Sequence, residues 1–278
     1  MIALMFHITL LLTLAFTSTG CQESPAANPP LQKLVITGSS TLAPLIADIG
    51  KQFETKHPGI RIDVQTGGSS RGVADARSGI AHIGMASRTL YEQETVDLVG
   101  ITIAQDGIGL IVHTDNPVTN LTTQQVKEIY TGKIRDWKTI GGQDAPIVVV
   151  NKAEGRATLE IFLQHFQLIN SAIKADVIIG DNEHGIKTVA GNPLAIAYVS
   201  IGAATYDASV GVPIKLLQLD SIPASLTTVQ NGIFPLSRPL TLVTTKHPHA
   251  LAQTFISYSR SPHVQHLVTQ HAFISLAS

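Results

Sequence analysis

Apolar and polar positions follow two periods along this chain, and the first change of period falls at a glycine. Leu34 to Ile36 form a continuous apolar run, which is typical of a buried strand. From Leu42 onward the apolar residues recur at the i, i+3, i+4 and i+7 spacing of one helix face. Gly38 separates the two patterns. The sequence therefore predicts a strand, a glycine turn and a helix between residues 34 and 53.

The same order of elements is repeated further along the chain. Residues 60–64 alternate between apolar and polar, as in a half-buried strand, and a glycine turn with a short helix follows at 67–77. A third predicted strand at 80–85 leads directly to Ser87. In open α/β sheets, ligands bind at the carboxyl ends of the strands. Three successive strands that end in serine-rich loops therefore favour one shared binding edge.

The second half of the chain continues the alternation of strands and helices. Residues 101–112 are apolar except at 105–107, which indicates a strand with a polar bend and a candidate crossover between domains. Thr122 and Gln125 have the spacing of a capping box and open a helix over 123–130. The remaining predicted strands are 147–150, 195–199, 214–219 and 240–244, and the remaining predicted helices are 159–166, 248–259 and 262–270.

Composition limits the classes of partner. The 278 residues suffice for two domains, each with its own core. The 19 Lys and Arg nearly balance the 20 Asp and Glu, so no broad basic surface is expected and nucleic acid is not a predicted partner. The 11 histidines form no zinc-protease motif, and no Walker lysine follows the glycine turns. We therefore expect no metal, nucleotide or other cofactor, and any anion site must be local.

The first 20 residues contain no Lys, Arg, Asp or Glu and run apolar from Ile2 to Phe16 before small residues and Cys21. This segment resembles a bacterial lipoprotein signal peptide, and its apolar run is too short for a confident transmembrane helix. The resemblance implies a signal peptide at 1–20, lipidation of Cys21 as the first mature residue, and a tether at 21–30. Plain secretion with cleavage nearby is the alternative. Either reading places the protein outside the cytoplasm, in the periplasm or cell envelope.

The turn after the first strand has the chemistry of an anion cradle. Pro44 is tolerated only in the first turn of a helix, so the helix cap is expected at Ser40 or Thr41. Free N–H groups, the helix dipole and the hydroxyls of Ser39, Ser40 and Thr41 then point toward one spot. Simple helix capping by Ser and Thr is the alternative interpretation.

Seven segments occur in this order along the chain: TGSSTLAPL at 37–45, GGSSRG at 67–72, IGMASR at 83–88, QDGIGLIV at 105–112, IYTGKIRDW at 129–137, GNPLAIAYVS at 191–200 and PLSRPLTL at 235–242. Together they resemble the substrate-binding proteins of phosphate ABC transporters, in the type II periplasmic binding protein superfamily. The resemblance implies an α/β fold of two lobes, joined by crossover hinge strands, with a ligand cleft between them. It implies a first lobe of residues 31–112 plus 205–278 and a second lobe of residues 113–204.

The same resemblance implies a binding protein that catalyses no reaction. Its expected ligand is an inorganic oxyanion, most of all phosphate, and its expected partners are the membrane subunits of an ABC permease and, through the lipid anchor, the membrane. The residues implied to contact the oxyanion carry hydroxyl, carboxylate or cationic groups: Ser39, Ser40, Thr41, Ser69, Ser70, Ser87, Arg88, Asp106, Lys152, Arg156 and Thr158.

Two positions depart from the family pattern. One branch of the family has an Asp at the place of Arg88, and that Asp accepts a proton from phosphate, which excludes fully ionised sulfate. Arginine is a donor only, so Asp106 is the nearest candidate acceptor. The family usually has Arg at the place of Lys152 and Ser-Gly-Thr at 156–158, where this chain has Arg156-Ala157-Thr158. The cation is thereby displaced toward the helix start, where a guanidinium can still make forked contacts.

Two other functions are compatible with the sequence. A lipoprotein of the same fold could act as an anion sensor or scaffold instead of serving a permease. Residues 68–72 also match the G-x-S-x-G pattern of serine hydrolases, with Ser70 as nucleophile and Asp220 and His271 following in the appropriate chain order.

Overall fold

The computed structural model describes residues 31–276, and it begins with three parallel strands. β1 (Gln32–Gly38) lies between β2 (Ile60–Thr66) and β3 (Ile83–Ala86) and pairs with both in parallel. The carboxyl ends of the three strands therefore meet at the same edge of the sheet, as the sequence predicts.

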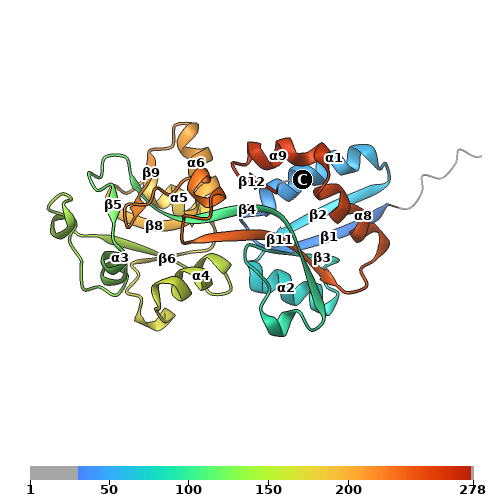
Figure 1. Ribbon diagram of the computed structural model, residues 1–278, viewed down its shortest axis with the longest axis horizontal. Helices are drawn as coiled ribbons and strands as arrows, with labels where there is room; N and C mark the ends of the chain where they lie inside the picture. The colour runs from blue at the N-terminus through green and yellow to red at the C-terminus, as the bar shows by residue number, and fades with distance from the viewer. Residues whose placement is uncertain (1–30, 277–278) are drawn as a thin grey trace, which may run out of the picture. The chain divides into compact units, whose positions relative to one another are not determined.

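The first lobe packs helices against this parallel sheet (Figure 1). The apolar face of α1, with Leu45, Ile49 and Phe53 fully buried, packs with Leu34 and Ile36 of β1 in one core. The sequence periodicity that predicted α1 is thus the periodicity of its buried face. The helices of this lobe are α1 (Ala43–Lys56), α2 (Ser69–Ser78), α8 (Ala250–Ser259) and α9 (Gln265–Gln270).

Two antiparallel strands connect the lobes, β4 (Leu98–His113) and β11 (Ser237–Thr245). Residues 98–107 of β4 pair with β11, and residues 108–112 pair with β8 (Ala195–Ser200) of the second lobe. One strand thus belongs to the sheets of both lobes. The continuous strand order is β2-β1-β3-β11-β4-β8-β6-β7, and Figure 1 shows β4 and β11 running side by side between the two groups of helices.

The second lobe has its own apolar core around the aromatic side chains Trp137, Tyr130, Phe162 and Tyr198. The predicted capping box of Thr122 and Gln125 is present at the start of its first helix. Beyond β8, its sheet continues with β6 (Val148–Lys152) and β7 (Val177–Ile179). Its main helices are α3 (Thr123–Tyr130), α4 (Ala157–Phe166), α5 (Asn182–Ala190) and α6 (Ile201–Ser209).

The structure moves the return to the first lobe from the expected residue 205 to β11. β9 (Ile214–Leu216) pairs with the second-lobe end of β4, and β10 (Gln218–Leu219) pairs with β5 (Asn120–Leu121). Side chains of 217–236 lie in the second-lobe core because these pairings carry them there. The lobes therefore comprise residues 31–107 with 237–276, and residues 108–236.

The N-cap of α1 is Leu42, whereas the sequence predicted the cap at Ser40 or Thr41. Short elements complete the described chain. Across residues 31–276, every helix is too short or too polar to cross a membrane. The short elements are η1 (Glu92–Glu94), η2 (Trp137–Ile140), η3 (Asn170–Ala172), α7 (Leu226–Gln230), η4 (Pro262–Val264) and β12 (Ile274–Ser275).

Candidate functional site

A buried ion pair lies where the two hinge strands meet. Arg238 of β11 and Asp106 of β4 are cross-strand neighbours, and their side chains are 1% and 0% exposed. Arg238 donates from Nη2 at 2.8 Å and from Nε at 3.2 Å to the same oxygen, Oδ2 of Asp106. The other carboxylate oxygen accepts the N–H of Gly202 at 3.1 Å. Both partners are therefore held in place before any ligand is considered.

The guanidinium of Arg238 gathers hydroxyl groups from both lobes. Its Nη1 donates to Ser87 Oγ at 3.2 Å and to Thr158 Oγ1 at 3.0 Å, and its Nη2 donates to Thr41 Oγ1 at 3.3 Å. Ser69 Oγ accepts the backbone N–H of Ser87 at 3.1 Å and lies 3.5 Å from its hydroxyl. Two strand ends of the first lobe and the start of α4 thus meet at one arginine, and the third strand end joins them through the contact of Ser69 with Ser87.

A second buried cation lies beside this arginine. Lys152 is 3% exposed, and its Nζ donates to Asn182 Oδ1 at 3.2 Å. Asn182 in turn donates to Thr41 Oγ1 at 3.1 Å. Burial, with the positive charges of Arg238 and Arg156, lowers the pKa of Lys152 to about 7, although Asp181 acts in the opposite direction. Among the residues joined by these hydrogen bonds, Arg238 and Lys152 face one carboxylate, Asp106, and an anion bound beside Lys152 would favour its protonated form.

Four helices begin around these residues. Ser69, Thr158 and Asn182 lie in the first two positions of α2, α4 and α5, and Thr41 lies two residues before the start of α1. In α1, α2 and α4 the N-cap side chain accepts no hydrogen bond from the helix, so no capping side chain occupies the N–H groups of these first turns. Free N–H groups and helix dipoles bind anions. We call the following set the cleft cluster: Thr41, Ser69, Ser87, Asp106, Lys152, Thr158, Asn182 and Arg238.

A cavity of about 760 Å³ borders the cleft cluster and is lined from both lobes. Ser40 and Thr41 line it on the first lobe, and Asp181 and Asn182 line it on the second. In residues 31–276 no group of three or more His, Cys, Asp or Glu could hold a metal ion. The cleft cluster itself offers hydroxyls, an amide, two buried basic side chains and one carboxylate. The cavity beside it is also lined by the acidic residues Asp48, Asp181, Glu183 and Asp207.

The structure separates the predicted site residues into groups. Thr41, Ser69, Ser87, Asp106, Lys152 and Thr158 come together in the cleft cluster. Ser39 is buried beside them and its N–H donates to Met85 O at 2.9 Å, while Ser40 lines the cavity. The N-cap residue Arg156 lies close enough to Lys152 to lower its pKa, and its Nε is buried without a hydrogen-bond partner among the described residues.

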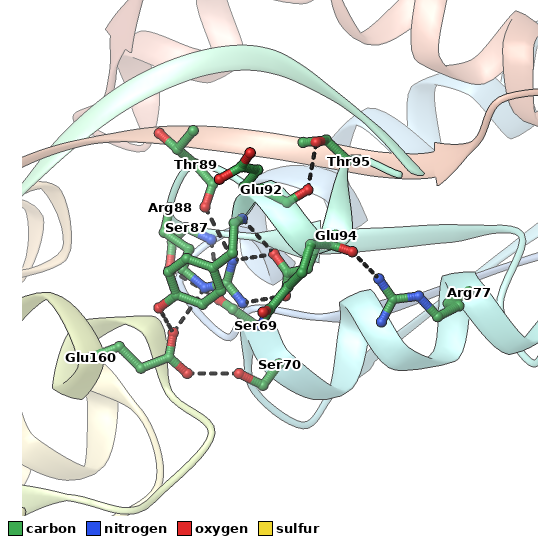
Figure 2. A network of polar contacts seen from close by, with 12 residues as sticks. Ser69, Ser70, Arg77, Ser87, Arg88, Thr89, Glu92, Glu94, Thr95 and Glu160 are labelled. Atoms are coloured by element: carbon green, nitrogen blue, oxygen red, sulfur yellow. Dashed lines mark hydrogen bonds and ion pairs between the residues drawn. The ribbon is translucent and has the colours of Figure 1, made fainter. Parts of the chain in front are cut away.

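Two predicted site residues are directed elsewhere. Arg88 pairs with Glu94 and Glu160, and Ser70 donates to Glu160 at 2.6 Å (Figure 2). Their hydrogen bonds are made with carboxylates rather than with the cleft cluster. Arg88 lacks a free forked face, so the arrangement gives it a role other than the expected anion contact.

Sequence reasoning missed Arg238 and Asn182. Arg238 lies within PLSRPLTL, one of the segments that carry the family resemblance, but the resemblance assigned no role to it. Asn182 follows β7, a strand of three residues whose apolar run is too short to be noticed. A basic residue directly before the largely apolar run at 239–243, inside a segment that carries the family resemblance, is the signal that could have identified Arg238.

The structure does not bring together the three residues of the hydrolase alternative. Ser70 donates to Glu160, Asp220 accepts from Thr123, and His271 contacts Asp48. The three residues of the supposed triad thus have three different partners. By contrast, two α/β lobes that are connected by two strands and line a shared cavity define a solute-binding protein of the periplasmic binding type.

Comparison with known proteins specifies the family. A family model described as PBP superfamily domain matches residues 23–263. A structure from Clostridium perfringens, described as a phosphate ABC transporter substrate-binding protein with bound phosphate, is 33% identical, and the match covers 88% of this chain and 100% of that one with a TM-score of 0.81. An ABC-type phosphate transport receptor from Vibrio cholerae is 28% identical, with 87% and 100% covered and a TM-score of 0.72.

A curated relative agrees with these structures. The phosphate-binding protein PstS of Bacillus subtilis is 29% identical over 246 residues, which are 87% of this chain and 80% of that protein. The chain therefore belongs to the PBP superfamily and, within it, to the phosphate ABC transporter substrate-binding proteins. This family consists of solute-binding transport proteins and not of enzymes.

Proposed function

We propose that this protein captures inorganic phosphate in the cleft between its lobes and supplies it to an ABC permease. The observation that carries the proposal is the buried pair of cations, Arg238 and Lys152, at the start of four helices, with Asp106 as the carboxylate of the cluster. The relatives named as phosphate-binding proteins support the same ligand.

In this proposal the anion replaces contacts within the cleft cluster. Hydroxyls of Thr41, Ser87 and Thr158 turn from Arg238 toward phosphate oxygens, and Arg238 offers its Nη groups. Charged hydrogen bonds contribute about 1.5–3 kcal/mol each, against about 1 kcal/mol for neutral ones, so the cations should dominate the affinity. Arg156 adds a further positive charge at the N-cap of α4.

Asp106 supports selection of phosphate over sulfate. A carboxylate offers about four acceptor positions, and three are used by the two Arg238 donors and the Gly202 N–H. The remaining position can accept the hydrogen of a protonated phosphate oxygen. Sulfate carries no such hydrogen and meets only the negative charge of Asp106.

Calorimetric titration of the mature domain tests this function directly. We expect phosphate to bind, and sulfate, molybdate and tungstate to bind more weakly or not at all. A purified domain that binds none of these oxyanions would contradict the proposal.

Transport and anchoring are separate parts of the proposal. Attachment through lipidated Cys21 predicts that the protein fractionates with membranes and that a Cys21→Ser variant is released; this residue lies outside the described part of the chain. Loss of phosphate uptake on deletion of the gene supports delivery to a permease. Unchanged uptake favours the alternative of an anion sensor or scaffold.

A further inference from the structure

A carboxylate of the second lobe accepts three side-chain hydrogen bonds from the first lobe (Figure 2). Glu160 Oε1 accepts from Ser70 Oγ at 2.6 Å, and Oε2 accepts from Arg88 Nε at 2.8 Å and from Tyr91 Oη at 2.9 Å. Ser70 N also donates to Gly155 O at 3.3 Å across the same boundary. These contacts use no residue of the cleft cluster, so they join the lobes without direct contact to the anion site.

The first-lobe side of this contact is preformed. Arg88 donates to Glu94 from Nη1 at 2.7 Å and from Nη2 at 2.9 Å, and both residues belong to the first lobe. Its guanidinium also stacks over the Tyr91 ring at 3.9 Å. When the lobes separate, Arg88 therefore keeps a paired charge and a fixed orientation. Only its Nε loses a partner, and docking of Glu160 requires little ordering of the first lobe.

Tyr91 remains a donor in this arrangement. Burial and the adjacent Glu160 carboxylate raise the pKa of Tyr91 to about 12, so its hydroxyl keeps its proton at neutral pH. Its backbone N–H donates to Glu94 at 2.8 Å, which fixes the chain next to Arg88. The preformed site thus presents one cationic and two hydroxyl donors to a single carboxylate.

The contact is linked to the cleft cluster through α4. Glu160 follows Thr158 by two residues in the first turns of this helix, and Thr158 accepts a hydrogen bond from Arg238. A helix turn is stiff, so docking of Glu160 on the first lobe also positions Thr158 at the anion site. Closure of the lobes therefore docks Glu160 on the first lobe and brings Thr158 to the anion site at the same time.

We propose that Glu160 is a positioning residue for oxyanion capture, which fastens α4 to the first lobe in the closed protein and slows release of the ligand without touching it. This inference rests on the proposed function. Apparent affinity scales with the fraction of molecules in the binding-competent state. A contact that favours closure therefore tightens every oxyanion by the same factor and leaves the ratio of phosphate to sulfate affinity unchanged.

The first experiment compares Glu160→Gln with Glu154→Gln in the full chain. Glu154 is an exposed carboxylate in the loop before α4 that accepts from Asn170 within the second lobe, so it serves as a matched control. We expect Glu160→Gln to raise the phosphate dissociation rate about 10-fold or more, with a similar association rate and an unchanged phosphate-to-sulfate ratio. An unchanged dissociation rate, or an altered ratio, would overturn the inference.

A second variant removes one hydrogen-bond donor of the same contact and leaves the carboxylate in place. Tyr91→Phe keeps the aromatic ring over Arg88 and deletes only the hydroxyl that donates to Glu160. We expect a smaller increase in the dissociation rate than for Glu160→Gln. The two changes should be non-additive because both residues share one hydrogen bond. Strict additivity would contradict a shared contact.

Distances between the lobes separate this inference from the proposed function. Spin labels at Ile80 and Ile178, which are 66% and 67% exposed on the first and second lobes, report separation in a Cys21→Ser background. Without any anion, we expect longer or broader distances in Glu160→Gln than in Glu154→Gln. Identical distributions would overturn the role of Glu160, even if the wild type bound no oxyanion and the proposed function had failed.

Discussion

Arg238 and Asp106 show how a buried charge pair can be kept for binding. Both side chains are almost fully shielded from solvent, and Arg238 donates to the hydroxyls of Thr41 and Ser87 in the first lobe and of Thr158 in α4. Buried ion pairs contribute little net stability because desolvation offsets their attraction. In the proposed function the pair serves recognition: the guanidinium attracts an anion, and the carboxylate accepts a hydrogen from it.

Asp106→Asn should reduce discrimination between phosphate and sulfate. The amide has nearly the same shape but removes the negative charge that disfavours sulfate, so we expect the ratio of the two dissociation constants to fall about 10-fold or more. Titration calorimetry with both anions measures this ratio. Asp144→Asn, on the exposed surface of the second lobe, controls for a change of net charge. An unchanged ratio in Asp106→Asn would exclude this carboxylate as the acceptor.

Lys152→Met should stabilise the anion-free protein at low pH while weakening phosphate binding. In the folded protein the pKa of Lys152 is lowered from 10.5 to about 7, so between these values the unfolded chain binds more protons. Its contribution therefore makes the wild type more stable as pH rises from 7 to 10, and the full penalty is present below pH 7.

The expected gain for the Met variant is about 1–4 kcal/mol in the free energy of unfolding at pH 6, and it shrinks toward pH 10. Urea denaturation at a series of pH values, without phosphate, measures the difference between variant and wild type. A difference that does not depend on pH would show that Lys152 is not the group responsible.

At the level of single elements, local pattern determined what the sequence could reveal. β1, α1 and the serine-rich strand ends were predicted because each is encoded within a few neighbouring residues, and Thr41, Ser69 and Ser87 followed from them. Arg238 could not be predicted in this way because it is 197 positions from Thr41, to which it donates. Asn182 similarly depends on a short strand, β7, that only the tertiary structure stabilises.

Gly68 provides a test of how the start of α2 approaches the second lobe. Its φ is +96°, and a Cβ at this position would lie 2.5 Å from Gly155 O. We expect Gly68→Ala to prevent full closure and weaken phosphate binding about 10-fold, with a loss of stability of about 1–3 kcal/mol from backbone strain.

Gly79→Ala is the matched control for this prediction. Gly79 follows α2, has a φ of +73°, and has no atom within 4 Å of its Cβ position. It therefore reports the cost of the positive φ alone, and we expect reduced thermal stability with unchanged phosphate affinity. Equal affinity in both alanine variants would show that Gly68 does not limit closure.

At the level of the whole molecule, the family resemblance predicted the two-lobed fold correctly but not where the chain returns to the first lobe. The apolar strand at 214–219 carries no local mark that distinguishes one core from the other. The pairing of β10 with β5, about 100 positions earlier in the chain, assigns it to the second lobe. Long-range pairing of this kind is invisible to hydrophobic periodicity.

Trp137 offers a measurement of closure as a rigid-body movement. This single tryptophan is fully buried in the second-lobe core, and its Nε1 donates to Leu194 O at 2.9 Å. If closure moves the lobes as units about β4 and β11, phosphate should leave the tryptophan emission maximum unchanged. Solution scattering should show a decreased radius of gyration in the same titration. A shifted emission maximum would indicate rearrangement within the second lobe.

The path of β4 and β11 also determines the order in which the protein can be assembled. The second lobe is one uninterrupted stretch, residues 108–236, whereas the first lobe needs segments from both sides of it. A chain synthesised from its N-terminus can complete the second lobe while β3 still lacks its neighbour β11. An unpaired strand edge is a site for wrong association, so this interval is a vulnerable one. The binding cleft, whose arginine arrives on β11, is finished last.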